Sequence, residues 1–333
     1  MRVLLTGGTG FIGLNIAEKM LESGNDVILY GLKPLVENTK KKFQNYEGNY
    51  YFVRGDVLNQ DLIDLTIKKF RVSVIIHGAA ITPSIDREKM DAKNIMNVNC
   101  MGTIEVLEAA RKNNVSKFVY LSSVAVYGNE AFESKLLKED ISVSKPHTLY
   151  EISKFSAESV VTRYKEVHGM DIIITRIGDA YGPWEHHTGV RDLLSPPFQA
   201  TRFALEGKKA LLPRKGYKSW VYSKDIAISV EKLLEAPYLK YNLYNISSGH
   251  FWSMEDWCQL LSKRYTDFEY QIVEEPNKEN IIFHGTRDNA PLDINRLIGD
   301  TNYVPSYDIG KSFEDYVLWV EENINLLTGE GLS

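Results

Sequence analysis

The feature that most constrains this chain is a glycine-rich turn directly after its first apolar run. Residues 3–5 read Val-Leu-Leu, residues 6–13 read Thr-Gly-Gly-Thr-Gly-Phe-Ile-Gly, and residues 14–22 have good helix propensity. Glycines at 7 and 10 permit a tight turn in which backbone N–H groups approach a pyrophosphate, and Gly13 lets the helix pack closely on the strand. The pattern therefore predicts a dinucleotide site. Its expected contacts are Gly7, Thr9, Gly10, Phe11, Ile12 and Gly13.

Further short apolar runs follow this turn, with helix-like segments between most of them. Runs that are apolar throughout are typical of strands covered on both faces, and their alternation with helices predicts a parallel sheet. We therefore expect an α/β fold: a doubly wound parallel sheet of the Rossmann type over 1–175, after which the chain crosses between the lobes, and a smaller C-terminal α/β substrate lobe formed mainly by 176–333. The further runs lie at 27–30, 51–53, 74–76, 118–121 and 172–175.

Composition and charge argue against several classes of protein. The 333 residues are 44% hydrophobic, which is enough for a full core, and the net charge is −5. Because the basic residues are scattered, we expect neither nucleic acid nor a membrane surface as a partner. No charged leader or long apolar stretch follows Met1, and Cys100 and Cys258 lack metal-like spacing. We expect a reduced, cytoplasmic protein without a metal site or a disulfide.

A tyrosine and a lysine four residues apart form the candidate catalytic pair. On a helix, Tyr150 and Lys154 share one face. A nearby cation favours phenolate, so Lys154 would lower the pKa of the phenol and let Tyr150 act as a general acid or base. Ser122 and Ser123 close the predicted strand over 118–121, and ligands in this fold collect at the C-terminal ends of the strands.

The order of these motifs resembles the extended short-chain dehydrogenase/reductase family, also called the NAD-dependent epimerase/dehydratase family. The resemblance covers nearly the whole chain. It implies that Ser123 hydrogen-bonds the reacting oxygen, that Tyr150 exchanges its proton, and that Lys154 holds the nicotinamide ribose. It also implies a homodimer formed through helices of the Rossmann domain. The motifs are residues 6–13, 55–57, 77–80, 97–99, 102–103, 122–123, 126–128, 150–154 and 181–183. The cofactor contacts that it adds are Asp56, Val57, Ala79, Ala80, Asn99, Leu121, Ser122, Ile177, Tyr150 and Lys154.

For three of these residues, a purely structural role is the alternative to cofactor or substrate binding. Asp56 would then be a turn aspartate, Ser123 a strand-end serine bonded by backbone, and Asn99 a helix-interior asparagine.

The expected cofactor is NAD or NADP. An acid at the end of the second strand would bind the ribose hydroxyls of NAD, but Gly31 stands there and Lys33 follows. The sequence leans slightly to NADP, with a solvated surface lysine as the alternative for Lys33.

Two residues after Ser123 argue against one branch of the family. The 4,6-dehydratases of sugar nucleotides carry an acidic pair there for water elimination, whereas this chain has Val124 and Ala125. Neither side chain is a general acid or base. Decarboxylases of the family resemble a pattern with an acid nearby, so they are disfavoured too.

Two positions near the expected substrate diphosphate also depart from the family. Asp179 stands in place of an asparagine, where its carboxylate would repel phosphate, and Lys218 stands in place of an arginine, without the bidentate fork. Arg287 matches a second family arginine, so a nucleoside diphosphate stays open. Alternatively, Asp179 pairs with a neighbour such as Arg176.

The expected substrate loop begins after residues 181–183. Arg191 would clamp a carboxylate or phosphate, or else pair with Asp192 or another nearby acid. His186 and His187 lack a third ligand at metal spacing, so we expect no zinc. The full set of expected substrate contacts is Thr82, Val124, Asp179, His186, Arg191, Lys218 and Arg287.

Three functional hypotheses remain. The first is an NAD(P)-dependent oxidoreductase that oxidises or reduces a secondary alcohol or ketone on a sugar-like or polyhydroxy-acid substrate. The second is a nucleotide-sugar 4-epimerase that keeps its NAD tightly bound. The third is a non-catalytic dinucleotide sensor on the same fold, because a fold does not determine a function.

Overall fold

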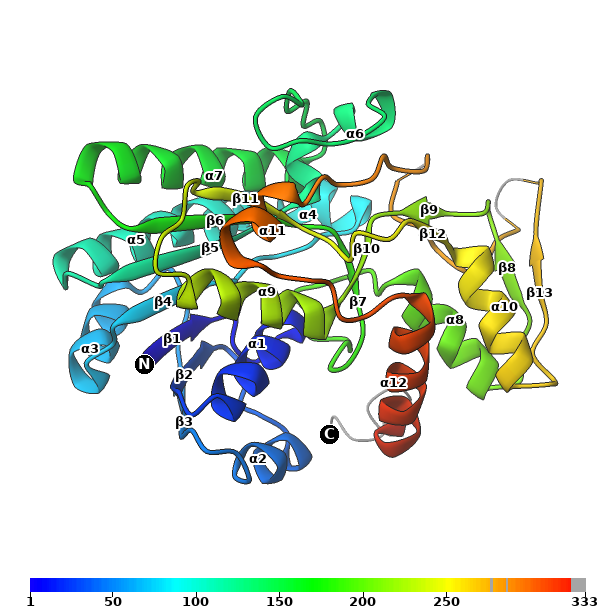
Figure 1. Ribbon diagram of the computed structural model, residues 1–333, viewed down its shortest axis with the longest axis horizontal. Helices are drawn as coiled ribbons and strands as arrows, with labels where there is room; N and C mark the ends of the chain where they lie inside the picture. The colour runs from blue at the N-terminus through cyan, green and yellow to red at the C-terminus, as the bar shows by residue number, and fades with distance from the viewer. Residues whose placement is uncertain (276–277, 286, 325–333) are drawn as a thin grey trace.

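A seven-stranded parallel sheet forms the centre of the computed structural model, which describes residues 1–275, 278–285 and 287–324 (Figure 1). The strand order is β11-β6-β5-β4-β1-β2-β3. The order reverses direction at β1, as in doubly wound folds, and ligands bind at such a reversal. The bounds are β1 (Arg2–Thr6), β2 (Asp26–Gly31), β3 (Tyr50–Arg54), β4 (Val74–His77), β5 (Lys117–Ser123), β6 (Ile172–Ile177) and β11 (Leu243–Ile246).

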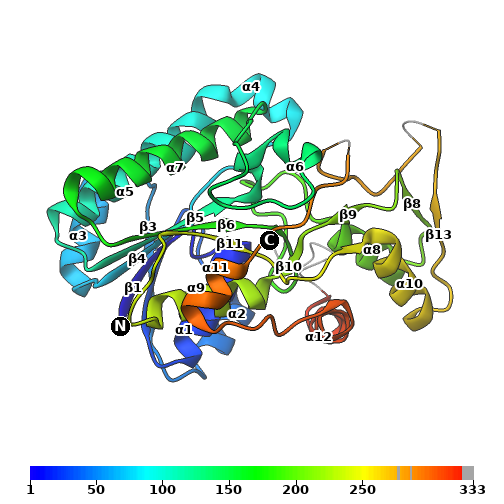
Figure 2. The same cartoon turned by 45° about the horizontal axis from the view of Figure 1, so that its top comes forward.

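Helices cover both faces of the sheet (Figure 2). One layer holds α1 (Phe11–Glu22), α2 (Glu37–Phe43) and α9 (Ser223–Glu235), and the other holds α3 (Gln60–Phe70), α4 (Ile85–Met96), α5 (Gly102–Lys112) and α7 (Leu149–His168). Alternate residues of β1 serve the two layers: Val3 and Leu5 belong to one hydrophobic cluster and Leu4 to the other. Burial on both faces explains the uninterrupted apolar runs. The doubly wound α/β prediction is confirmed.

The C-terminal lobe is built of short elements (right-hand side of Figure 1). Its strands pair two by two: β7 with β10 and β8 with β13 in parallel, and β9 with β12 antiparallel. Their bounds are β7 (Asp179–Tyr181), β8 (Ala210–Leu212), β9 (Tyr217–Lys218), β10 (Trp220–Tyr222), β12 (Trp252–Ser253) and β13 (Tyr270–Ile272). The remaining helices are α6 (Glu130–Glu133), α8 (Pro196–Leu205), α10 (Met254–Arg264), α11 (Asn295–Thr301) and α12 (Ile309–Glu322), with a π-helical turn η1 (Asn97–Met101) and a 3-10 turn η2 (Val124–Tyr127).

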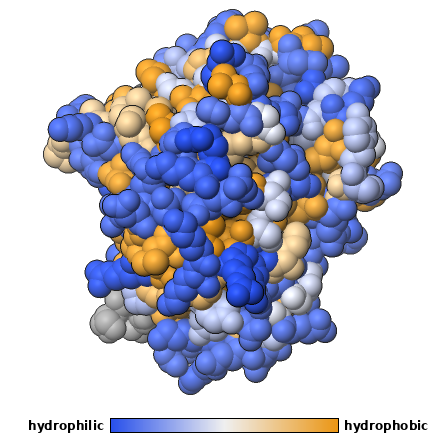
Figure 3. All heavy atoms as spheres, turned by 90° about the vertical axis from the view of Figure 1, so that its left-hand side faces the viewer, coloured by the Kyte–Doolittle hydropathy of each residue, from blue (hydrophilic) through white to orange (hydrophobic). Residues whose placement is uncertain are grey.

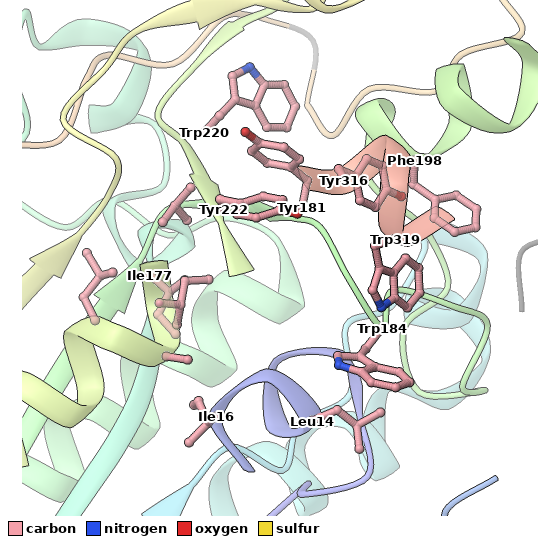
Figure 4. Close-up of a cluster of buried hydrophobic side chains, with 14 of the residues drawn as sticks. Leu14, Ile16, Ile177, Tyr181, Trp184, Phe198, Trp220, Tyr222, Tyr316 and Trp319 are labelled. Atoms are coloured by element: carbon pink, nitrogen blue, oxygen red, sulfur yellow. The ribbon is translucent and has the colours of Figure 1, made fainter. Parts of the chain in front are cut away.

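The chain beyond residue 175 contributes to both lobes. After β7 and the first part of the C-terminal lobe, it returns to the central sheet through α9 and β11, and Leu243 of β11 lies opposite Ile174 of β6. The apolar residues of β11 therefore extend the Rossmann sheet by one strand. The two lobes consequently share one continuous core, whose aromatic part lies around Tyr181 and Trp220 (Figure 4).

The two ends of the sheet differ in character. Figure 3 views the side from which β1 starts, where hydrophilic side chains cover most of the surface and apolar ones lie in small groups. At the other end, the carboxyl ends of the parallel strands meet the C-terminal lobe, and this is where ligands of such sheets bind. Within the described residues, no helix has the length and apolarity needed to cross a membrane.

Candidate active site

A cavity of about 1450 Å³ runs along the carboxyl ends of the central strands and under the C-terminal lobe. It is lined by the glycine turn after β1, by the residues that follow β4, β5 and β6, and by the loop at 186–191. Every cofactor, substrate or catalytic residue that we predicted from the sequence lines it, with the exception of Asn99.

Asn99 is buried in η1 and supports the cavity from behind. Its side-chain amide donates hydrogen bonds to the Ile81 carbonyl and to Ser153 Oγ, both at 2.9 Å, and its side-chain oxygen accepts one from the Ile81 N–H at 2.7 Å. The amide therefore fixes the segment after β4 to the helix that carries Tyr150. It is 1% exposed, so this structural role accounts for its polar groups.

The glycine turn forms a cradle that side chains would fill. Gly7 has φ of +69°, and a Cβ there would lie 2.9 Å from the Ala79 backbone. A Cβ at Gly13 would lie 2.2 Å from the Gly7 carbonyl oxygen. Gly10 precedes α1 and offers no side-chain cap, so the first N–H groups of the helix are left to a ligand. These residues fit the diphosphate of a dinucleotide, which binds backbone N–H groups at a helix N-terminus.

The adenosine side of the cavity carries no acid at the end of β2. Lys33 lines the cavity there, and a Cβ on Gly189 would lie 3.7 Å from its ammonium. Asp56 also lines the cavity, and its carboxylate accepts the Leu58 N–H at 3.0 Å. Asp56 thus stabilises its own turn while one face of it remains available to a ligand.

A capped helix start positions the tyrosine and the lysine. Thr148 is the N-cap of α7: its Oγ1 accepts the Glu151 N–H at 3.3 Å, and the Glu151 carboxylate accepts the Thr148 N–H at 3.1 Å. This reciprocal box fixes the first turn of α7, which contains Tyr150. Lys154 follows one turn later on the same face. The sequence analysis did not identify this box, although Thr148 followed three residues on by Glu151 is a signal that could have predicted it.

Lys154 is buried beneath the cavity. Its side-chain ammonium donates to the Leu121 carbonyl at 2.8 Å and lies 4.4 Å from the centre of the Tyr120 ring. Burial lowers its pKa to about 7, and the nearby Glu158 carboxylate opposes that shift. A lysine whose charge is this sensitive to its surroundings is typical of functional sites.

Ser123 ends β5 and opens η2. Its Oγ accepts the Ala125 N–H at 3.2 Å, so its own hydrogen remains available for donation into the cavity. The strand-end role and the hydrogen-bonding role are therefore compatible in one side chain. Ser122, its neighbour, donates instead to the buried Glu158 carboxylate at 2.6 Å.

Arg176 has a partner other than Asp179. Its guanidinium binds the Glu158 carboxylate, with the closest contact at 2.6 Å. Asp179 instead pairs with Lys218 at 2.8 Å and receives a longer hydrogen bond from Asn289 at 3.4 Å. The alternative in which a neighbour neutralises Asp179 is therefore confirmed, but the neighbour is Lys218 and not Arg176, because β6 directs Arg176 to the α7 side of the sheet, toward Glu158.

The loop between β7 and α8 is held by ion pairs that were only partly foreseen. Arg191 pairs with Glu185 at 3.0 Å, while Asp192 pairs with Arg87. Arg191 is thus paired with a nearby acid, but that acid is not Asp192. His186 contacts the Trp184 carbonyl through Nδ1 at 2.8 Å, and burial lowers its pKa. No cluster of three potential metal ligands occurs among the described residues.

Two residues that the sequence did not single out also line the substrate side. His284 is half-buried there, and burial together with the charges of Arg191 and Lys218 lowers its pKa below the usual value. Phe132 stacks under the Arg287 guanidinium at 4.6 Å. Neither belongs to a motif, so only the fold could place them.

Comparisons with known proteins agree with this geometry. A family model described as the NAD dependent epimerase/dehydratase family matches residues 3–247. A dTDP-glucose 4,6-dehydratase of Streptomyces niveus is 28% identical over 255 residues, which cover 70% of this chain and 69% of the relative. A putative UDP-glucose 4-epimerase of Methanocaldococcus jannaschii is 27% identical over 327 residues, which cover 96% of this chain and 99% of the relative.

Solved structures extend the similarity to the whole fold. A dTDP-glucose 4,6-dehydratase from Bacillus anthracis in complex with NAD matches with a TM-score of 0.79 and 26% identity, over 97% of each chain. A UDP-glucose 4-epimerase from Thermotoga maritima with UDP-glucose matches with a TM-score of 0.79 over 97% of this chain and all of that one. Its identity is 19%, which shows a shared fold alone.

Proposed function

Because this chain belongs to the NAD dependent epimerase/dehydratase family, we propose that it oxidises or reduces a secondary alcohol or ketone on a sugar-like or polyhydroxy-acid substrate. The observation that carries the proposal is the convergence of Ser123, Tyr150 and Lys154 on one cavity beside the glycine cradle. Each has the chemistry for its part: a hydroxyl donor, a phenol and a buried ammonium.

The chain uses NAD or NADP, and the residues present fit such a cofactor. The glycines at 7, 10 and 13 line the cavity and are packed too closely for side chains, as a backbone turn around a diphosphate requires, and Lys33 lines the cavity after β2, so a 2′-phosphate there would meet a cation. When bound, the nicotinamide supplies the hydride acceptor or donor for the reaction.

The protein's own residues transfer the proton of the reacting hydroxyl. Tyr150 Oη takes the proton of the reacting hydroxyl when its carbon is oxidised and returns a proton to that oxygen when the ketone is reduced. Ser123 donates a hydrogen bond to the same substrate oxygen. The Lys154 ammonium, one helical turn from Tyr150, would hold the nicotinamide ribose.

The two positions after Ser123 offer no side chain for water elimination. Val124 and Ala125 line the cavity next to Ser123, and neither side chain transfers protons. The relatives named dehydratases therefore do not extend their named activity to this chain, and simple redox or epimerisation remains.

The charges on the substrate side favour a substrate with little negative charge. Asp179 and Lys218 neutralise each other, so the Lys218 ammonium offers no unpaired charge to a phosphate. Among the described residues, Arg191 and Lys218 are ion-paired, whereas no ion pair is seen for Arg287, which lies over the Phe132 ring. Its guanidinium can bind the carboxylate of a sugar acid through two parallel hydrogen bonds, and we therefore favour a sugar acid over a nucleoside diphosphate, which carries more charge.

A nucleotide-sugar 4-epimerase is the second candidate. It is favoured by the relative from Methanocaldococcus jannaschii, which aligns over 96% of this chain. Ser123, Tyr150 and Lys154 would serve it equally, because the proton removed during oxidation is returned when the ketone is reduced on its other face. A non-catalytic dinucleotide sensor is the third, and the three intact catalytic side chains argue against it.

Calorimetric titration of cofactor-free protein distinguishes these candidates. The titrants are NADP, NAD, UDP, GDP and dTDP, with AMP as the reference for a nucleotide that has no diphosphate. We expect the dinucleotides to bind and the nucleoside diphosphates to bind no better than AMP. Tight binding of one diphosphate would overturn the sugar-acid assignment in favour of the epimerase, and its base would identify the substrate family. Tight dinucleotide binding without turnover of any sugar or sugar acid would favour the sensor.

A further inference from the structure

A segment between β7 and α8 crosses the dinucleotide side of the cavity, and we call residues 183–192 the strap. Its first end is fixed to α1. Asn15 donates to the Pro183 carbonyl at 2.9 Å, and the Trp184 indole N–H donates to the Glu18 carboxylate at 2.8 Å. Both partners lie on the helix that begins at the glycine cradle.

Trp184 fixes this end of the strap in the core. Its side chain is 2% exposed and packs against Phe43 of α2 and Trp319 of α12, with ring centres 6.3 and 5.5 Å away. Figure 4 shows the indole between Trp319 and Leu14 of α1. The backbone at Trp184 has φ of +68°, a conformation that a large residue adopts only when its surroundings impose it.

The second end of the strap is tied to the segment after β4. The Thr82 N–H donates to the Val190 carbonyl at 2.8 Å, and the Asp192 N–H donates back to the Thr82 carbonyl at 3.1 Å. Arg87 donates to the Gly189 carbonyl at 2.9 Å. The middle of the strap, residues 186–190, passes Lys33 on its way and lines the cavity. The strap thus spans the site from the α1 side to the β4 side.

The guanidinium of Arg191, a residue of the strap, lies near the start of α1, where the glycine cradle ends. The Arg191 guanidinium lies 5.4 Å from the centre of the Phe11 ring, and Phe11 is the first residue of α1. Arg191 donates through Nε to the Leu193 carbonyl at 3.1 Å and pairs through Nη2 with Glu185. Of its five N–H groups, those that remain are left for a ligand in the cavity.

Glu185 holds this guanidinium in place. The carboxylate is fully buried and accepts from the Ser195 N–H at 2.7 Å and from Ser195 Oγ at 2.5 Å. A buried carboxylate with fixed partners gives Arg191 a single orientation. We therefore propose that Arg191, positioned by Glu185, binds the diphosphate of NAD(P) from the side opposite the glycine cradle, and that the strap must open for the cofactor to exchange.

This inference rests on the proposed function only in requiring a dinucleotide in the cavity. It reassigns Arg191 from the substrate to the cofactor. The Tyr150 chemistry described above is tested by turnover, whereas the strap is tested by cofactor binding, so either can fail alone.

The test of Arg191 is the equilibrium and rate of dinucleotide binding, followed by fluorescence of the reduced cofactor. Arg191→Met should raise the dissociation constant for NAD(P) and for ADP-ribose by about tenfold or more, because a charge-assisted contact is lost. The constant for AMP, which has no diphosphate, should change little. Arg191→Lys keeps the charge, so its dissociation constant for NAD(P) should lie between those of the wild type and Arg191→Met. The matched control is Arg163→Met, which removes an exposed arginine whose partner is Glu166.

The positioning role of Glu185 is tested by a double-mutant cycle. Glu185→Gln should weaken dinucleotide binding, and it should add little once Arg191 is already methionine, because the two residues act as one unit. Additive effects would overturn the positioning role. Unchanged dinucleotide affinity in Arg191→Met, with a raised KM for the carbohydrate substrate, would return Arg191 to the substrate.

A separate variant tests whether the strap must open for the cofactor to exchange. Trp184→Phe keeps an aromatic ring in the core but removes part of the indole's packing and the N–H that bonds Glu18, so it loosens the first end of the strap. If the strap gates exchange, the association and dissociation rates of NAD(P) should both rise by several fold, with a smaller change in their ratio. Two unchanged rates, in a variant with wild-type thermal unfolding, would overturn the gate.

Discussion

Lys218 and Asp179 lie 2.8 Å apart in the wall of the cavity, and these are the two positions at which the chain departs from the sugar-nucleotide pattern. Each departure compensates the other. The carboxylate that would repel a phosphate is neutralised by the lysine that replaces the family's arginine. The pair therefore leaves this part of the cavity electrically neutral rather than cationic.

Replacing Asp179 should convert the site toward a nucleotide site. Asp179→Asn removes the carboxylate and releases the Lys218 ammonium, so we expect affinity for UDP or dTDP to rise by about tenfold, as measured by calorimetry. Loss of the buried pair should also lower the free energy of unfolding by about 3 kcal/mol. An unchanged diphosphate affinity would show that the pair does not set the substrate class. Asp288→Asn, which disturbs the ion pair with Arg214 instead, is the matched control.

Lys33 should discriminate between the two cofactors. We expect Lys33→Glu to weaken NADP binding by about tenfold or more, because a carboxylate would repel the 2′-phosphate, and to leave NAD binding nearly unchanged. The dissociation constants of the two reduced cofactors measure this. Lys41→Glu, which makes the same charge change on α2, should affect neither. Equal weakening of NAD and NADP by Lys33→Glu would mean that Lys33 does not face the 2′ position.

Burial of Lys154 should appear in the pH dependence of stability of the cofactor-free protein. Its pKa is lowered to about 7 in the fold, whereas an unfolded lysine titrates near 10.4. Between these two values the unfolded chain binds more protons at this group than the folded chain. The contribution of Lys154 to stability is therefore unfavourable below pH 7 and becomes less so as the pH rises toward 10.

The variant Lys154→Met makes this contribution measurable. The stability gained by Lys154→Met over the wild type should be largest near pH 6 and should shrink as the pH approaches 10, in chemical unfolding experiments. Lys165→Met, on the same helix, is the control and should show a flat difference. A flat difference for Lys154→Met as well would mean that the ammonium is better solvated than its burial indicates.

Local patterns in the sequence were sufficient for the cradle and the catalytic pair. Gly7, Gly10 and Gly13 follow each other within one turn, and Tyr150 and Lys154 lie within one helical turn, so nearest-neighbour geometry determines their relation. Six of the seven strands of the Rossmann sheet were visible as apolar runs, whereas β11, which follows the first part of the C-terminal lobe, was not predicted to belong to this sheet.

Relations between distant segments could not be read in this way. Asp179 and Lys218 are on different strands, and the pairing of β7 with β10 brings them together. Asn99 carries a motif typical of a cofactor contact, but the π-helical turn directs its amide to Ile81 and Ser153. These contacts depend on which elements pack side by side, and the sequence around each residue does not indicate that packing.

The central claim is that Tyr150 exchanges the proton during hydride transfer. The most direct measurement is the change in nicotinamide absorbance when the enzyme is mixed with NAD(P) and a panel of sugars and sugar acids, in the wild type, Tyr150→Phe and Tyr164→Phe. Tyr164 is the matched control, because it lies on the same helix as Tyr150 and its hydroxyl donates to Glu108 of α5. We predict that Tyr150→Phe keeps dinucleotide affinity and loses at least about 100-fold in rate, while Tyr164→Phe stays close to the wild type. A Tyr150→Phe rate equal to that of the wild type would contradict the account.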